Sequence, residues 1–172
     1  MIKTIRGDIL DAQEKYIVHQ CNSTSSQAAG LALQIFAKYP YANIYKNRGG
    51  SVFGYKYISA FHTTEESPGN IVIKGDGNKQ RFIINLIGQV YPGAPLHDGL
   101  RDGYKVREGY FNQCLTKILG IPNIESIALP VGIGCGLAGG NWSNYLPMIE
   151  KFDRAVNERQ KVNVVLYNKD AK

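Results

Sequence analysis

At 172 residues, with 44% hydrophobic and 20% charged residues, the chain has the size and composition of a single domain over 1–172 with one core. It has no apolar run of roughly 18–20 residues, as a membrane span needs, and its start, MIKTIRGDIL, lacks the core of a signal peptide. We therefore expect a cytoplasmic protein with no membrane partner. Its net charge of +6 weakly favours an anionic partner, and three scattered cysteines without a Cys-x-x-Cys pair argue against a disulfide framework and a metal site.

The first half of the chain alternates strand and helix patterns. A short strand ends at Gly7-Asp8, and an apolar strand, YIVHQCNS, ends in polar residues. A helix follows that opens with serines suited to capping and stops at Pro40. The expected ranges are strands over 2–8, 16–23 and 51–61, and a helix over 25–40.

The second half continues the alternation. Two strands within 70–89 are joined by a GDGN turn, and a loop rich in proline and glycine follows over 90–99. The later expected elements are a helix over 100–120, a strand over 124–131, a helix over 141–158 and a strand over 161–168. This alternation predicts an α/β domain with a mostly parallel or mixed sheet.

The stretch VGIGCGLAGGNW, residues 131–142, holds five glycines between a strand and a helix. It contains G-x-G-x-x-G, but a dinucleotide-binding unit needs this motif early in the chain and an acidic residue about 20 positions later. A Walker A loop is excluded because no Gly-Lys-Ser/Thr sequence is present. The stretch therefore indicates a loop whose backbone N–H groups converge on an anion, or a tight turn without a ligand.

A second stretch, STSSQAAGLA over 23–32, also runs from a strand end into a helix start. In open α/β sheets, ligands bind beyond the carboxyl ends of the strands. Two such loops at neighbouring strand ends can hold a diphosphate from both sides.

Four segments in this order resemble the macrodomain family over essentially the whole chain: RGDIL, IVHQCNS with AAGLALQIFAKYP, ALPVGIGCGLAGGNW, and NVVLYN. The sequence is most similar to the terminal ADP-ribose glycohydrolase subfamily and to yeast-type and phage ADP-ribose-1''-phosphate phosphatases. The resemblance implies a three-layer α/β/α sandwich with a mixed central sheet, ADP-ribose as the ligand, and no cofactor or metal.

The resemblance also assigns binding roles. Asp8, with Ile9 beside it, would accept a hydrogen bond from the adenine amine, or else cap the turn after Gly7. Asn22 would bind the distal ribose. Ala28, Ala29, Gly30 and Leu31 would contact one phosphate; Gly132, Ile133, Gly134, Cys135, Gly136 and Leu137 would wrap the other phosphate and the distal ribose; Tyr167 or Asn168 would border the adenine.

Both catalytic groups of the glycohydrolase subfamily are missing. Gln89 stands at the position of its nucleophilic lysine, and Ala138 at the position of its aspartate. The phosphatases instead share a His-x-Cys-Asn context, which His19 to Asn22 reproduces. His19 is therefore the candidate catalytic group, although a core histidine within an apolar strand is an equal alternative.

Other candidate groups carry less weight. Asp98 and Asp102 are weak candidates for an assisting carboxylate, and His97 has no assigned role. Cys135 could be a thiolate near a helix start, but an inert thiol fits its loop better.

The resemblance therefore implies hydrolysis of ADP-ribose-1''-phosphate, and we expect the chain to act as a monomer. Three alternatives stay open. The chain is a reader of ADP-ribose or of ADP-ribosylated protein or nucleic acid, a hydrolase that uses a substrate-bound water, or an RNA-binding module.

Overall fold

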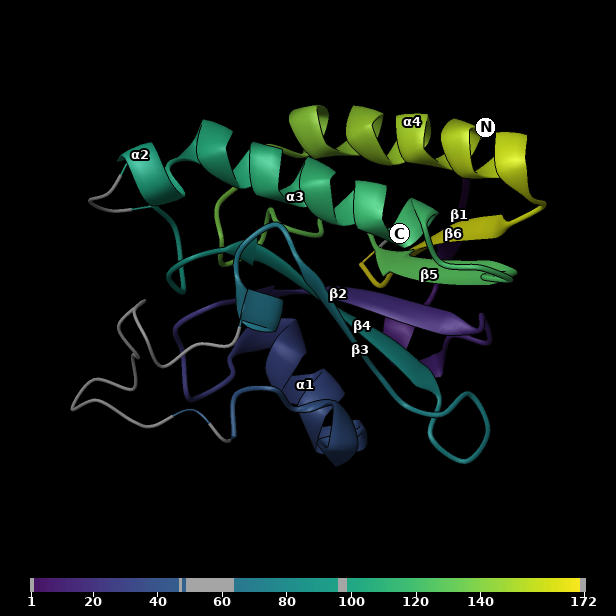
Figure 1. The fold of residues 1–172 in the computed structure, drawn as a ribbon, viewed down its shortest axis with the longest axis horizontal. Coiled ribbons are helices and arrows are strands. Elements are labelled where there is room, and N and C mark those ends of the chain that lie inside the picture. Colours follow the sequence, from purple (N-terminus) through teal and green to yellow (C-terminus); the bar gives the residue numbers. More distant parts are fainter. Residues whose placement is uncertain (1, 47, 49–63, 96–98, 171–172) are drawn as a thin grey trace.

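A central mixed sheet of six strands organises the chain in the computed structural model, which describes residues 2–46, 48, 64–95 and 99–170 (Figure 1). Its strand order is β1-β6-β5-β2-β4-β3, with β3 antiparallel to β4 and the other neighbours parallel. The strands are β1 (Lys3–Arg6), β2 (Tyr16–Asn22), β3 (Ile71–Lys74), β4 (Phe82–Gln89), β5 (Ser126–Pro130) and β6 (Asn163–Asn168).

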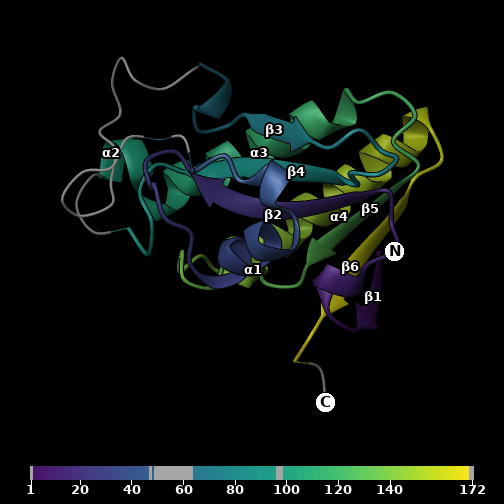
Figure 2. The same ribbon diagram turned by 90° about the horizontal axis from the view of Figure 1, so that it is seen from below.

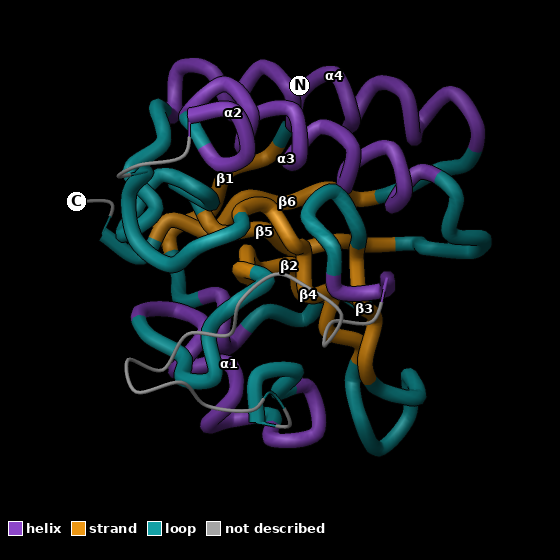
Figure 3. Tube along the Cα trace, turned by 60° about the vertical axis from the view of Figure 1, so that its left-hand side comes forward, coloured by secondary structure: helices purple, strands orange, loops and turns teal. Residues whose placement is uncertain are grey.

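Helices cover both faces of the sheet and make three layers. In Figures 1 and 3, α3 and α4 lie side by side on one face and α1 lies on the other. Figure 2 shows α1 lying over β2. No described helix is long and apolar enough to cross a membrane. The helices are α1 (Gly30–Lys38), α2 (Gly99–Asp102), α3 (Tyr104–Leu119) and α4 (Trp142–Arg159), with short 3₁₀ turns at Ile9–Asp11, Pro40–Ala42 and Thr64–Glu66.

Alternation along the buried strands divides the core between the two faces. On β2, Val18 belongs to the cluster packed under α3 and α4, whereas Ile17 and Cys21 belong to the cluster under α1. On β4, Leu86 and Ile87 divide in the same way. Apolar residues on both faces explain why these strands read as nearly continuous hydrophobic runs.

The expected fold class, an α/β/α sandwich with a mixed sheet, is confirmed, and two local expectations need correction. The first helix begins at Gly30, with Ala29 as its N-cap and no side-chain cap, so the serines of 25–26 do not cap it. The helix expected over 100–120 is two helices, α2 and α3, separated at Gly103. The strand expected over 51–61 lies outside the described residues.

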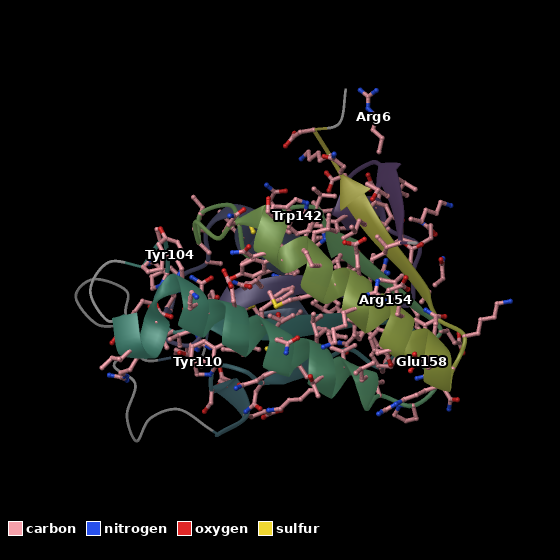
Figure 4. The ribbon with its side chains drawn as sticks, turned by 90° about the horizontal axis from the view of Figure 1, so that it is seen from above. Arg6, Tyr104, Tyr110, Trp142, Arg154 and Glu158 are labelled. Carbon is pink, nitrogen blue, oxygen red and sulfur yellow. The ribbon has the colours of Figure 1, made fainter. Side chains whose placement is uncertain are left out.

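The parallel arrangement brings the carboxyl ends of β1, β6, β5, β2 and β4 to one edge of the sheet. Figure 4 shows that α3 and α4 start at the same end of the molecule, where Tyr104 and Trp142 are labelled. This edge is where the sequence placed the ligand-binding loops.

Candidate functional site

A cavity of about 310 Å³ opens at the carboxyl ends of β2, β4 and β5. Pockets of roughly 300–1,000 Å³ are typical of small-molecule sites. Tyr45 and residues within 25–32, 92–93 and 130–138 complete its described lining. Most of the expected phosphate and ribose contacts line it: Asn22, Ala29, Gly30, Leu31, Gly132, Ile133, Gly134, Gly136 and Leu137. Ala28 and Cys135 belong to the same loops but do not line the cavity.

The glycine loop, residues 131–140, supplies backbone donors. The N–H groups of Cys135, Gly139 and Gly140 form hydrogen bonds within the loop, and that of Ile133 donates to the carbonyl of Pro130 just before it. Within the described part of the chain, the N–H groups of Gly134, Gly136 and Leu137 have no backbone acceptor. Unpaired N–H groups in a tight loop are suited to binding an anion.

Gly134 cannot be replaced without disturbing this loop. Its φ of +77° lies in the left-handed region, and an added Cβ would lie 2.6 Å from Cε2 of Tyr145. The two binding loops also meet each other, because a Cβ on Gly30 would lie 3.0 Å from Cδ1 of Leu137. The loops therefore face the cavity together.

Asn22 closes the end of β2 with its side chain. Its Oδ1 accepts hydrogen bonds from the N–H groups of Thr24 (3.1 Å) and Ser25 (2.7 Å). The amide oxygen is thus occupied, and the amide N–H₂ is the group left for a ligand. Asn22 can therefore donate to a ribose hydroxyl, but its occupied amide oxygen is not free to accept from one.

Tyr45 and Arg48 hold the turn at Asn22 from behind. The Tyr45 hydroxyl accepts the N–H of Asn22 at 2.8 Å, and Nη1 of Arg48 donates to the carbonyls of Asn22 and Ser25, both at 3.0 Å. Arg48 also pairs with Glu66 at 2.9 Å. The turn is therefore fixed by buried side chains distant in sequence.

The residues expected at the adenine lie beside the cavity but do not line it. Oδ1 of Asp8 accepts the N–H of Leu10 at 2.9 Å, and its Oδ2 lies 3.2 Å from Nζ of Lys169. The Leu10 N–H, followed by Lys169, lowers the pKa of Asp8 below its ordinary value. Asp8 is thus a helix cap and an ionised acceptor at once.

The backbone of Tyr167 connects the residues expected at the adenine with the residues that line the cavity. The Tyr167 hydroxyl donates to Glu14 at 2.5 Å, and its carbonyl accepts the N–H of Val131, a cavity residue, at 2.9 Å. Asn168 pairs in register with Arg6, and its carbonyl accepts the N–H of Gly7. Neighbouring strands lie about 4.8 Å apart, so the Asp8 region and the cavity form one row along the sheet edge.

The structure places His19 in the core and not beside a phosphate. It is fully buried and does not line the cavity. Its Nε2 donates to Oδ1 of Asn85 at 2.6 Å, and its ring packs edge-on against Phe36 of α1. Burial lowers the pKa of His19 to about 4. This location does not support a role as general acid, base or nucleophile.

None of the other titratable groups that the structure describes is an ionised group lining the cavity. Asp102 is buried against Arg107, outside the lining, and His97 and Asp98 lie outside the described residues. Burial raises the pKa of Cys21 to about 12 and that of Tyr45 well above its ordinary value. Among the described residues that line the cavity, none carries a charge at neutral pH.

Gln89 lines the cavity where the glycohydrolase resemblance places a lysine. Its Nε2 donates to the carbonyls of Tyr91 (2.7 Å) and Gly93 (3.4 Å), and its Oε1 accepts from Nε2 of Gln20 at 2.7 Å. Gln20 and Tyr45 are cavity residues that the sequence analysis missed. Only the alternation of β2 could have indicated Gln20; Tyr45 lies outside any motif.

The cavity and its loops can be compared with known proteins. No protein-family model matches the sequence, and no curated protein matches it. A solved protein of unknown function from Bacteroides thetaiotaomicron matches with a TM-score of 0.67 and 24% identity over 98% of both chains. The macrodomain of Thermus aquaticus DarG matches with a TM-score of 0.65 and 21% identity over 99% of both chains.

A Trypanosoma brucei macrodomain solved in complex with ADP also matches, with a TM-score of 0.62 and 13% identity over 98% of this chain and 63% of that one. Taken with the mixed sheet between helical layers, these likenesses define the fold: this chain has the macrodomain fold.

Proposed function

We propose that this chain binds ADP-ribose along the carboxyl edge of its sheet. The diphosphate lies between the loop at 25–32 and the glycine loop, and the adenine lies near Asp8. One observation carries the proposal. A cavity with unpaired backbone N–H donors and the ionised carboxylate of Asp8 lie along the same edge of the sheet. The Trypanosoma brucei macrodomain, solved with ADP, has the same fold.

The uncharged lining favours binding without hydrolysis. Phosphoryl transfer at neutral pH benefits from a nucleophile, acid or base with a pKa near neutrality. The described lining offers only amides, a hydroxyl, a buried thiol and a buried phenol as polar side chains. Because His19 lies in the core, the phosphatase activity suggested by the sequence loses its candidate group. We therefore propose a reader of ADP-ribose, free or attached to a macromolecule.

Calorimetric titration with ADP-ribose, ADP and AMP tests this proposal. We expect micromolar binding that weakens from ADP-ribose to ADP to AMP. Phosphate release from ADP-ribose-1''-phosphate is followed on the same sample and should stay at the level of a protein-free control. Absence of binding to all three ligands would reject the proposal, and steady phosphate release would replace the reader with a phosphatase.

Asp8→Asn tests the proposed contact with adenine separately from the contacts with the diphosphate. Asparagine is also a good helix cap, so the short helix after residue 8 should be preserved. Loss of the charge-assisted hydrogen bond should weaken AMP and ADP-ribose alike, by about tenfold. Glu158→Gln is the control, since Glu158 is exposed near the far end of α4 from Trp142 (Figure 4). Equal affinities in both variants would remove Asp8 from the site.

A further inference from the structure

A buried ion pair lies next to the cavity without lining it. Oδ2 of Asp102, the last residue of α2, is 2.5 Å from Nη2 of Arg107 in the first turn of α3. The two side chains are 3% and 2% exposed. Burying two charges commonly costs as much as their attraction returns, unless their remaining hydrogen-bonding groups find partners. The partners of this pair therefore indicate what it does.

The carboxylate of Asp102 binds the start of the loop after β4. It accepts the N–H of Val90 at 2.6 Å with one oxygen and the N–H of Tyr91 at 3.0 Å with the other. Arg107 binds the same loop from its carbonyl side, donating to Tyr91 (3.2 Å) and Gly93 (2.6 Å). Both polar groups of the Tyr91 backbone are thus held by the one ion pair.

Arg107 also reaches the second binding loop. Its Nη1 has two acceptors. It donates to the carbonyl of Gly93 and, at 3.1 Å, to the carbonyl of Ala138 in the glycine loop. Gly93 and Ala138 both line the cavity. The loops also touch nearby, since a Cβ on Gly139 would lie 3.1 Å from Cβ of Ala94. One planar guanidinium therefore joins two walls of the cavity, and its rigid fork fixes the spacing of the carbonyls.

We infer that the Arg107–Asp102 pair is a positioning device, which sets the distance between the loop at 90–94 and the glycine loop. Neither residue touches the ligand. Donors that must converge on a diphosphate bind best when their supporting residues hold them within about 0.5 Å of the required position. The pair thus controls affinity for the diphosphate from outside the cavity. This inference rests on the proposed binding of ADP-ribose.

Arg107→Lys tests the inference. A lysine keeps the charge, but its compact ammonium cannot reproduce the fork to Tyr91, Gly93 and Ala138. We expect the dissociation constants of ADP-ribose and ADP to rise about tenfold. This corresponds to the loss of about one hydrogen bond to a charged group. Amide hydrogen exchange should accelerate in 90–94 and 132–139 and stay unchanged in β5 and α4. Asp102→Asn should give the same loss of affinity and the same acceleration of exchange. It replaces Arg107→Lys in the test if that variant does not fold.

Val156→Ala is the matched control, because Val156 is a fully buried core residue of α4 that does not line the cavity. It should lower the melting temperature while leaving ligand affinity within twofold. The inference is overturned if Arg107→Lys and Asp102→Asn lower stability but keep both the affinity and the exchange of the two loops.

The two proposals fail separately. If the unmodified protein binds neither ADP-ribose nor ADP, the proposed function fails, and the exchange of the two loops still decides the positioning role. Acceleration confined to both loops supports that role, whereas uniform or unchanged exchange overturns it.

Discussion

Gln20 donates a hydrogen bond to Gln89 across neighbouring strands, with 2.7 Å between Nε2 and Oε1. The orientation of both amides is fixed, because Nε2 of Gln89 is itself held by the carbonyls of Tyr91 and Gly93. Oε1 of Gln20 is buried and has no hydrogen-bond partner among the residues that the structure describes. A buried amide that already lacks one partner depends strongly on the bond it keeps.

The Gln20–Gln89 hydrogen bond should therefore make the effects of substituting the two residues on the unfolding free energy non-additive. Gln89→Met leaves both ends of the Gln20 amide unpaired and should cost about 1–3 kcal/mol of unfolding free energy. Adding Gln20→Met removes the unpaired amide of Gln20. The carbonyls of Tyr91 and Gly93 still accept hydrogen bonds from Arg107 in the double variant. The double variant should thus be more stable than Gln89→Met alone, as measured by urea unfolding. Strictly additive losses would show that the two amides do not interact.

Two glycines of the same loop should respond differently to alanine. Gly134→Ala forces a Cβ into Tyr145 at a φ of +77° and should cost about 1–3 kcal/mol. That corresponds to a melting temperature lower by very roughly 2–12 °C. Gly136→Ala adds a Cβ with no atom of the described residues within 4 Å, and Gly136 has no positive φ, so the melting temperature should change little. Thermal unfolding of both variants checks this, and similar losses would contradict the loop geometry.

The sequence predicted most of the described elements and the position of the two loops at the sheet edge because their signals are local. Glycines at a strand end and apolar periodicity need no knowledge of distant residues. The supports of the loops could not be found in this way. Asn22 and Tyr45 are 23 positions apart, and Arg107 and Ala138 are 31 apart, with no shared motif.

The helix cap expected at the serines was wrong, and the structure separates the two alternatives for His19; both outcomes have a visible reason. The serines of 25–26 do not start a helix, because the Asn22 side chain binds the backbone of the turn and the helix begins only at Gly30. His19 matched a His-x-Cys-Asn context, yet alternation along β2 puts it on the face of Ile17 and Cys21, towards α1. The periodicity of the strand therefore agrees with the second alternative that the sequence left open, a core histidine.

The three cysteines should be slow to alkylate. Burial raises the pKa of Cys21 and Cys114 to about 12 and that of Cys135 to about 11. Since the thiolate is the reactive form, iodoacetamide at pH 8 should modify Cys135 more slowly than free cysteine and leave the other two unmodified. Mass spectrometry of the intact chain and of Cys135→Ser measures this. Rapid modification of Cys135 would indicate an activated thiolate in the glycine loop.

The buried His19 should make stability fall at acidic pH. Its pKa of about 4 in the folded chain lies below the value near 6.5 expected after unfolding. Between these values the unfolded chain binds more protons, so this stabilisation is complete above pH 6.5 and is lost as the pH falls towards 4. The full difference corresponds to about 3 kcal/mol.

His19→Gln isolates this contribution, because glutamine keeps a donor for Asn85 and does not titrate. Urea unfolding at pH 4.5, 5.5, 6.5 and 7.5 should show a steeper loss for the unmodified protein than for His19→Gln, with the two profiles parallel above pH 6.5. Parallel profiles over the whole range would mean that His19 titrates normally and is open to solvent. Such a result would return it to consideration as a catalytic group.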